Sequence, residues 1–121
     1  MFDHIGIKVA QLSTSIAFYR RTLAPLGMEL LSSGEGYAGF GPPGAPGLWL
    51  YEHSAGPIGP GVHLAFRAKD RAAVQAFHAQ GLEAGARDNG GPGPRPDYSA
   101  DYYAAFLLDP DGHNIEAVTF K

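Results

Sequence analysis

Two stretches of similar sequence decide the fold: HIGIKV at residues 4–9 and HLAFRA at residues 63–68. Each begins with a histidine, and in each the bulky apolar side chains alternate with smaller or polar ones, which is the period of a half-buried β-strand. The correspondence extends further, because Ala17-Phe18 and Ala76-Phe77 are separated by the same 59 positions as His4 and His63. The chain is therefore predicted to contain two related units in tandem.

A helix is predicted after each of these opening strands. In the first unit, apolar residues recur at helical spacing after Ser13 or Ser15, either of which is an expected N-cap, and the helix ends at Pro25 and Gly27. The second helix is expected over about residues 70–84. Short strands separated by Gly- and Pro-rich turns are predicted at 28–32, 36–40, 47–53, 102–108 and 114–120. A sixth strand is expected near 82–86, a long loop at 87–98, and a linker at 55–61.

The predicted fold class is α+β, with two tandem β-α-β-β-β modules at about residues 1–54 and 61–121 of a single 121-residue domain. We expect the modules to form a cup-shaped mixed sheet with the helices on its convex side. Ile5, Ile7, Leu64 and Phe66 would then face the helices. The alternation of a strand places His4 and His63 on the opposite, concave side.

Composition excludes several classes of partner and site. Nine basic and twelve acidic residues give a net charge of −3, so neither nucleic acid nor a membrane surface is expected as a partner. The absence of cysteine excludes a disulfide scaffold, a thiolate metal site and a cysteine nucleophile. There is no apolar stretch near 20 residues and no targeting signal, so the expected location is the cytoplasm.

A metal site is predicted from His4, His63 and Glu116. Glu116 lies in an apolar closing strand, where an unpaired carboxylate would cost several kcal/mol unless a cation accompanied it. Two imidazoles and one carboxylate are the set that holds Fe(II) or another divalent ion with positions left open. Taken singly, a strand histidine is more often a hydrogen-bonded structural residue, and Glu116 could be a rim residue. The shared register of the two histidines favours the metal site.

The remaining histidines, His53, His78 and His113, have no counterpart at the same position of the other module. An exposed or packing role is expected for His78, because Tyr19 occupies the corresponding position of the first helix.

The whole chain resembles the vicinal oxygen chelate superfamily, which includes glyoxalase I, fosfomycin-resistance proteins, extradiol dioxygenases and bleomycin-resistance proteins. The resemblance rests on HIGIKV and SIAFY (residues 15–19) in the first module, and on HLAF and DPDGHNIE (residues 109–116) in the second. It implies paired β-α-β-β-β modules around a divalent metal, with His4, His63 and Glu116 at the positions of the family's ligands.

One ligand position of glyoxalase I differs here. The resemblance places Trp49 where that enzyme has a fourth, carboxylate ligand. Glu52 is an odd number of residues away and is expected on the other side of its strand. The remaining set of two histidines and one glutamate is similar to that of extradiol dioxygenases and fosfomycin-resistance enzymes, and it suits Fe, Mn, Ni or Zn.

The predicted function is that of a metal-dependent lyase, isomerase or dioxygenase acting on a small oxygen-bearing molecule, with Glu116 and Tyr102 as catalytic candidates. Trp49, Arg95, Tyr98 and Tyr103 are the expected pocket residues, although alternation predicts that only one of Tyr102 and Tyr103 is surface-exposed. The alternative is a non-catalytic binding or sequestering protein of the bleomycin-resistance type. By the resemblance we expect a homodimer, and the sequence leaves open whether His4 meets His63 of its own chain or of a partner.

Overall fold

The computed structural model describes residues 1–56, 58 and 61–121, and it contains the two predicted β-α-β-β-β units. The first unit consists of β1 (Ile5–Val9), α1 (Leu12–Leu23), a short 3₁₀ helix η1 (Ala24–Leu26), β2 (Glu29–Gly34), β3 (Tyr37–Gly41) and β4 (Leu48–Glu52). The second consists of β5 (His63–Arg67), α2 (Arg71–Glu83), β6 (Arg87–Pro94), β7 (Tyr103–Leu108) and β8 (Asn114–Thr119). Of the predicted linker at 55–61, residues 57, 59 and 60 lie outside the described residues.

The strands form two four-stranded sheets in the orders β1-β4-β3-β2 and β5-β8-β7-β6. In each sheet the first strand of the module pairs in parallel with the last, and the other pairs are antiparallel. The two sheets thus repeat one topology. Within the described ranges no strand pairing joins them, so the sheets are not closed into a barrel.

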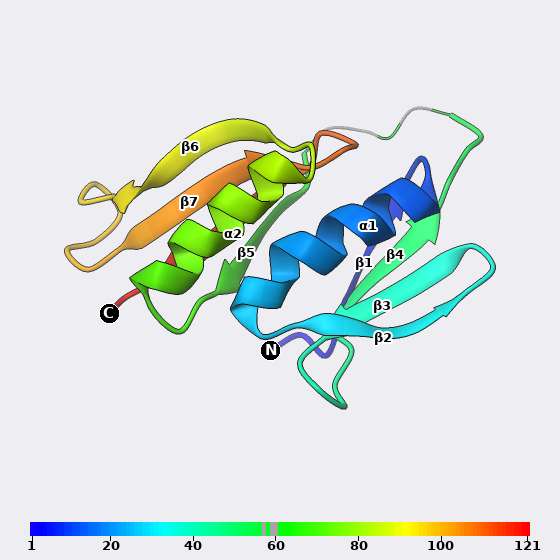
Figure 1. Cartoon of the computed structure of the whole chain (residues 1–121), viewed down its shortest axis with the longest axis horizontal. Helices are drawn as coiled ribbons and strands as arrows, with labels where there is room; N and C mark the ends of the chain where they lie inside the picture. The colour runs from blue at the N-terminus through cyan, green and yellow to red at the C-terminus, as the bar shows by residue number, and fades with distance from the viewer. Residues whose placement is uncertain (57, 59–60) are drawn as a thin grey trace.

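Both helices cover the same side of the two sheets and lie next to each other (Figure 1). The core fills the space between helices and sheets, and its fully buried large side chains include Phe18, Tyr19, Phe40, Phe77 and Leu107. An ion pair of 2.7 Å between Arg21 Nη2 and Glu83 Oε2 joins the two helices at the surface. Neither helix is long and apolar enough to cross a membrane.

Alternation along the opening strands places the histidines as predicted. In β1, Ile7 and Val9 are buried beneath the helices, whereas Lys8 is exposed, as is His4, which immediately precedes the strand. In β5, His63 is exposed at the position that pairs with Asn114 of β8. Both histidines therefore belong to the face of their sheet that points away from the helices, here called the outer face.

The sixth strand is a correction to the sequence analysis. Residues 82 and 83 belong to α2, and the strand is β6, inside the segment that was expected to be a loop. Its glycines and prolines have low strand propensity, but the pairing with β7 overrides that preference. The ladder is irregular between Asp88 and Gly93, where the residues of poorest propensity lie. An edge strand tolerates proline, because one row of its N–H groups has no strand to pair with.

The beginning of α1 also differs from the prediction that Ser13 or Ser15 caps it. The N-cap residue is Gln11, whose side chain makes no capping bond. Instead, the main-chain N–H of Leu12 donates to Oε2 of Glu52, at the end of β4, over 2.8 Å. A carboxylate distant in sequence thus satisfies one of the free N–H groups at the start of the helix and complements its dipole.

Candidate functional site

Glu116 is a nearly fully buried carboxylate on the outer face of the second sheet. Its neighbours in β8, Ile115 and Ala117, are fully buried on the helix side, whereas Glu116 is 2% exposed. It pairs with Ala65 of β5 and Phe106 of β7, so it occupies the middle of the sheet. A carboxylate in such a place needs partners to offset the loss of hydration.

Both oxygens of Glu116 have a partner. Oε1 lies 3.0 Å from Nε2 of His63, and the hydroxyl of Tyr102 donates a hydrogen bond to Oε2. Tyr102 immediately precedes β7, and its even position puts it on the same face as Phe106. The structure therefore brings together three of the residues that the sequence singled out: His63, Glu116 and Tyr102.

The second ring nitrogen of His63 also faces an oxygen. Nδ1 lies 3.2 Å from the main-chain carbonyl oxygen of Asn114, the residue with which His63 pairs. A neutral imidazole has a single N–H and can donate to one of these two acceptors. If Nδ1 donates to the carbonyl oxygen, Nε2 is left with its lone pair directed toward Oε1 of Glu116, and a metal ion bound by both atoms would account for that contact.

The donor set and its spacing fit a divalent ion. Two ligands in adjacent positions of an octahedral ion, with bonds of about 2.1 Å, are separated by about 3.0 Å. Nε2 of His63 and Oε1 of Glu116 are 3.0 Å apart. Imidazole and carboxylate are also the ligand types that Fe(II), Mn(II), Ni(II) and Zn(II) accept.

Tyr102 is held in place by two further aromatic rings. Tyr98 and Phe120 contact it edge to face, with centroid distances of 5.0 and 5.3 Å. Desolvation, followed by the hydrogen bond to Glu116, raises the pKa of Tyr102 to about 12. The phenol therefore remains protonated around neutral pH and acts as a donor to the carboxylate.

Arg95 lies on the outer face, whereas Tyr103 does not. The guanidinium of Arg95 lies 5.4 Å from the centroid of Phe106, whose ring also stacks with His63 at 6.3 Å. Tyr103 is buried on the helix side, where its hydroxyl accepts a hydrogen bond of 2.9 Å from Gln75. The expected pocket role of Tyr103 is thus not supported by its position, and the alternation that separates it from Tyr102 is observed.

His4 and Trp49 lie together on the outer face of the first sheet. Both line an open pocket of about 660 Å³, together with Tyr37 and Tyr51. The indole of Trp49 lies against Gly39, where an added Cβ would be 2.7 Å from the ring. The position that the resemblance assigned to a fourth ligand is therefore an aromatic part of the pocket wall.

Nδ1 of His4 lies 2.6 Å from Oδ1 of Asp3, which leaves Nε2 without a partner among the described residues. His4 and His63 also both line a cavity of about 440 Å³ at the edges of β1 and β5. Their ligand atoms and those of Glu116 nevertheless do not form a group within 4.8 Å in the described part of the chain. One chain thus assembles two members of the predicted metal site.

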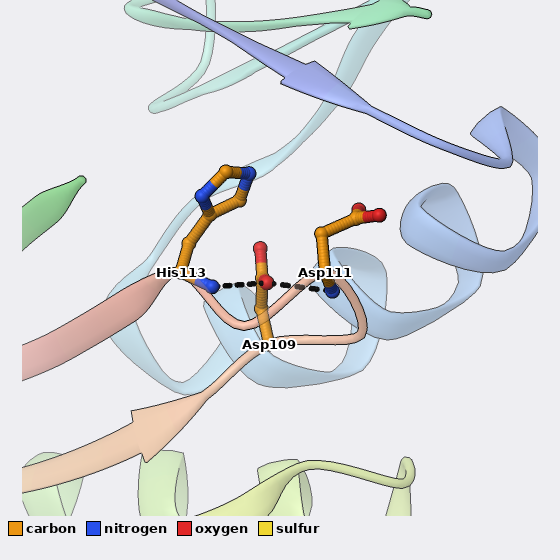
Figure 2. Close-up of side chains that lie close together, drawn as sticks. All are labelled: Asp109, Asp111 and His113. Atoms are coloured by element: carbon orange, nitrogen blue, oxygen red, sulfur yellow. Dashed lines mark hydrogen bonds between the residues drawn. The ribbon is translucent and has the colours of Figure 1, made fainter. Parts of the chain in front are cut away.

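A different group does meet that distance: Asp109, Asp111 and His113, in the turn between β7 and β8 (Figure 2). Oδ1 of Asp109 accepts hydrogen bonds from the main-chain N–H groups of Asp111 and His113, at 2.9 and 2.8 Å. Gly112 completes the turn with a φ of +86°, a conformation that favours glycine. The sequence identified this segment as a tight turn and as part of the resemblance, but it did not identify these side chains as a group.

Side-chain atoms of this turn also form hydrogen bonds with the first module. The hydroxyl of Tyr19 donates to Oδ2 of Asp109, the main-chain N–H of Ala10 donates to Asp111 over 3.0 Å, and His113 Nε2 lies 2.9 Å from the carbonyl oxygen of Lys8. We call Asp109, Asp111 and His113 the clasp. Hydrogen bonds already occupy most of the ligand atoms of the clasp, and this favours a structural role that joins the two modules.

Comparisons with known proteins agree with this fold. The profile described as Glyoxalase/Bleomycin resistance protein/Dioxygenase superfamily matches residues 1–117. No curated protein sequence matches the chain. Among solved structures, a glyoxalase/bleomycin resistance protein from Albidiferax ferrireducens T118 is similar at 29% identity, with a TM-score of 0.87 and 98% of each chain covered. A glyoxalase/bleomycin resistance protein/dioxygenase family enzyme from Burkholderia phytofirmans PsJN matches at 17% identity, with a TM-score of 0.78 and 98% of each chain covered.

Proposed function

The chain belongs to the Glyoxalase/Bleomycin resistance protein/Dioxygenase superfamily, and on that premise we propose that it binds one divalent metal ion through His63, Glu116 and His4. The ion would hold a small oxygen-bearing substrate for a lyase, isomerase or dioxygenase reaction. The observation that carries the proposal is the position of His63, whose two ring nitrogens both face oxygen acceptors. A metal ion at Nε2 satisfies the contact that a neutral imidazole leaves unmet.

Each proposed ligand has a second contact that fixes its orientation. Nδ1 of His63 faces the carbonyl oxygen of Asn114, Nδ1 of His4 faces Asp3, and Oε2 of Glu116 accepts from Tyr102. Such contacts select the tautomer of a metal-binding histidine and orient a metal-binding carboxylate. They leave Nε2 of each histidine and Oε1 of Glu116 as the atoms directed toward an ion.

We propose that His4 reaches this site from a second copy of the chain, which makes the protein a homodimer. The side chains of His4 and His63 are 56% and 48% exposed, and β1 and β5 are both edge strands of open sheets. A two-fold dimer would place β1 of one copy beside β5 of the other, twice. The cytoplasm, which the sequence predicts, remains the proposed location.

The contribution of the ion would be that of a Lewis acid, polarising an oxygen atom of the substrate. Side chains of the protein would orient the ligands and the substrate. Tyr102 holds its proton on the hydroxyl and donates a hydrogen bond to Oε2 of Glu116, and it would act as a donor or proton shuttle toward the substrate only after releasing that carboxylate oxygen. Phe106 and Tyr98 supply apolar surface around that position.

Calorimetric titration of demetallated protein with Mn(II), Ni(II), Zn(II) and, without oxygen, Fe(II) tests the metal site. We expect one ion per chain, with binding that weakens in acid because the imidazoles must be neutral. His63→Ala, Glu116→Ala and His4→Ala should each abolish stoichiometric binding. Glu52→Gln is the matched control, because Glu52 contacts the start of α1. If no ion binds the wild type more tightly than roughly 10 μM, the metal proposal is wrong.

Mixing two variants that do not bind metal tests whether His4 comes from the same chain as His63 or from a second copy. His4→Ala and His63→Ala each lack a different ligand, so a mixed dimer would contain one intact site if the site is shared between chains. Random exchange should then restore about a quarter of the wild-type binding capacity. No recovery, despite exchange shown by sedimentation, would place His4 and His63 in the same chain.

A non-catalytic binding protein is the alternative, and one observation favours it. The pocket beside His4 has three aromatic residues, Tyr37, Trp49 and Tyr51, in its wall. Aromatic side chains of this kind bind planar ligands by stacking. A protein that fails the metal titration but binds an aromatic ligand in this pocket would belong to that class.

A further inference from the structure

The glycine-rich strand β6 surrounds the side chain of Arg95. Nη2 of Arg95 donates to the carbonyl oxygen of Gly91 over 2.7 Å, and Nη1 donates to that of Pro94 over 3.3 Å. A Cβ added at Gly90 or Gly93 would lie 3.4 or 3.2 Å from the guanidinium nitrogens. The segment predicted from the sequence to be a loop therefore packs closely around one positively charged group.

The guanidinium has neutral partners only. Its hydrogen bonds go to main-chain carbonyl groups, and no carboxylate of the described residues lies within ion-pair distance of it. A guanidinium has five N–H donors in a planar fork, so donors remain after these two bonds. The remaining donors can bind an anionic group, and the hydrogen bonds between a guanidinium and a carboxylate are charge-assisted and can be bidentate.

Arg95 and His63 share one aromatic neighbour. Phe106 stacks with His63 on an interplanar angle of 20°, and Arg95 lies 5.4 Å from the centroid of the same ring. Phe106 in turn pairs with Glu116 in the adjacent strand. A small molecule lying over Phe106 could therefore contact the guanidinium at one end and the proposed metal ligands at the other.

We propose that Arg95 is the specificity-determining residue for an anionic substrate and binds the carboxylate of a small acid whose adjacent oxygen atoms lie toward His63 and Glu116. This inference rests on the proposed function for the position of those oxygens. The carboxylate contact itself depends on Arg95 alone. The planar fork of the guanidinium matches the two oxygens of a carboxylate, which a lysine does not reproduce.

The test compares two probes that share a pair of neighbouring hydroxyl groups and differ in charge: catechol and 3,4-dihydroxybenzoate. Zn(II)-loaded wild type should bind 3,4-dihydroxybenzoate at least tenfold more tightly than catechol in a calorimetric titration. Arg95→Gln should reduce this ratio to about one while leaving the affinity for catechol unchanged. Arg87→Gln, which removes the same charge at the other end of β6, should keep the wild-type ratio. If Arg95→Gln kept the wild-type ratio of the two affinities, the proposal would be overturned.

Two further measurements test the role of Arg95 independently of metal binding. Metal-free protein is titrated with benzoate and benzamide by NMR, and resonances around Arg95 should shift with benzoate only, in wild type and not in Arg95→Gln. If Zn(II) does not bind but this difference is seen, Arg95 is an anion site and the metal proposal is wrong. If benzoate shifts nothing, the proposal for Arg95 fails. Arg95→Lys keeps the charge without the fork, and should retain part of the preference.

Discussion

The hydroxyl of Tyr19 donates a hydrogen bond of 2.5 Å to Oδ2 of Asp109, and this bond joins α1 of the first module to the clasp of the second. Both residues are buried, with exposed fractions of 0% and 4%. The carboxyl group thus has a partner from the other half of the chain in a place where water does not reach it.

Removing this hydroxyl is expected to destabilise the protein. Tyr19→Phe leaves one oxygen of a buried carboxyl group without its donor, and should lower the free energy of unfolding by about 1.5–3 kcal/mol in urea denaturation. Tyr103→Phe is the matched control, since its hydroxyl contacts the neutral amide of Gln75 and should be worth about 0.5–1.5 kcal/mol. Equal losses in the two variants would contradict the special role of Tyr19.

The charge of Asp109 makes stability depend on pH. Burial raises the pKa of Asp109, although its hydrogen bonds to Tyr19 and His113 oppose the shift. The folded state therefore holds a proton that the unfolded state releases above about pH 3.9, and stability falls as the pH rises from there through the raised pKa. Asp109→Asn lacks this titration, so its stability relative to wild type should increase between pH 3.5 and 7 in urea denaturation. If the free energies of unfolding of wild type and Asp109→Asn changed in parallel with pH, the pKa of Asp109 would not be raised.

Tyr102 is expected to titrate about two pH units above an ordinary tyrosine, because its pKa is raised to about 12. In the unfolded chain the phenol ionises near pH 10, so its contribution to stability is complete below pH 10 and is lost between pH 10 and 12. The phenolate absorbance of wild type minus Tyr102→Phe should rise near pH 12. Glu116→Gln removes the neighbouring carboxylate and should move this titration toward pH 10. A difference spectrum that rises near pH 10 in wild type would refute the hydrogen bond to Glu116.

Gly81 of α2 packs directly on β7, and replacing it should be unfavourable. Alanine in a helix interior gains about 1 kcal/mol over glycine. A Cβ at residue 81 would, however, lie 2.2 Å from Cδ1 of Leu107, which is fully buried. Overpacking typically costs about 1–3 kcal/mol, so Gly81→Ala should be destabilised on balance.

The same contact provides a control for the Gly81 prediction. In a Leu107→Ala background the added methyl group meets open space, so Gly81→Ala should cost less there than in wild type. Additive effects of the two substitutions in thermal unfolding would contradict the proposed contact.

Strand alternation explains which parts of the site could be predicted. Because side chains of a strand point to opposite faces in turn, the sequence alone places His63 opposite Leu64, and Glu116 opposite Ile115. The same rule separates Tyr102 from Tyr103. It needs no knowledge of the partner strands, and the structure agrees with it at each of these positions.

Long-range contacts explain what could not be predicted. β6 exists because β7 pairs with it, while its own residues favour turns. The start of α1 is satisfied by Glu52 and approached by Asp111, which lie 40 and about 100 residues away along the chain. No local pattern around Gln11 indicates either contact.

Trp49 is the only tryptophan of the chain, and this makes the first sheet optically distinct from the second. Because the indole lies over Gly39 in the pocket that His4 also lines, its intrinsic fluorescence reports on that face of the first sheet. An open-shell ion bound at His4 would quench the emission, whereas Zn(II), with a closed shell, would not. The protein thus has a built-in optical reporter of what occupies the site beside His4, with no label attached.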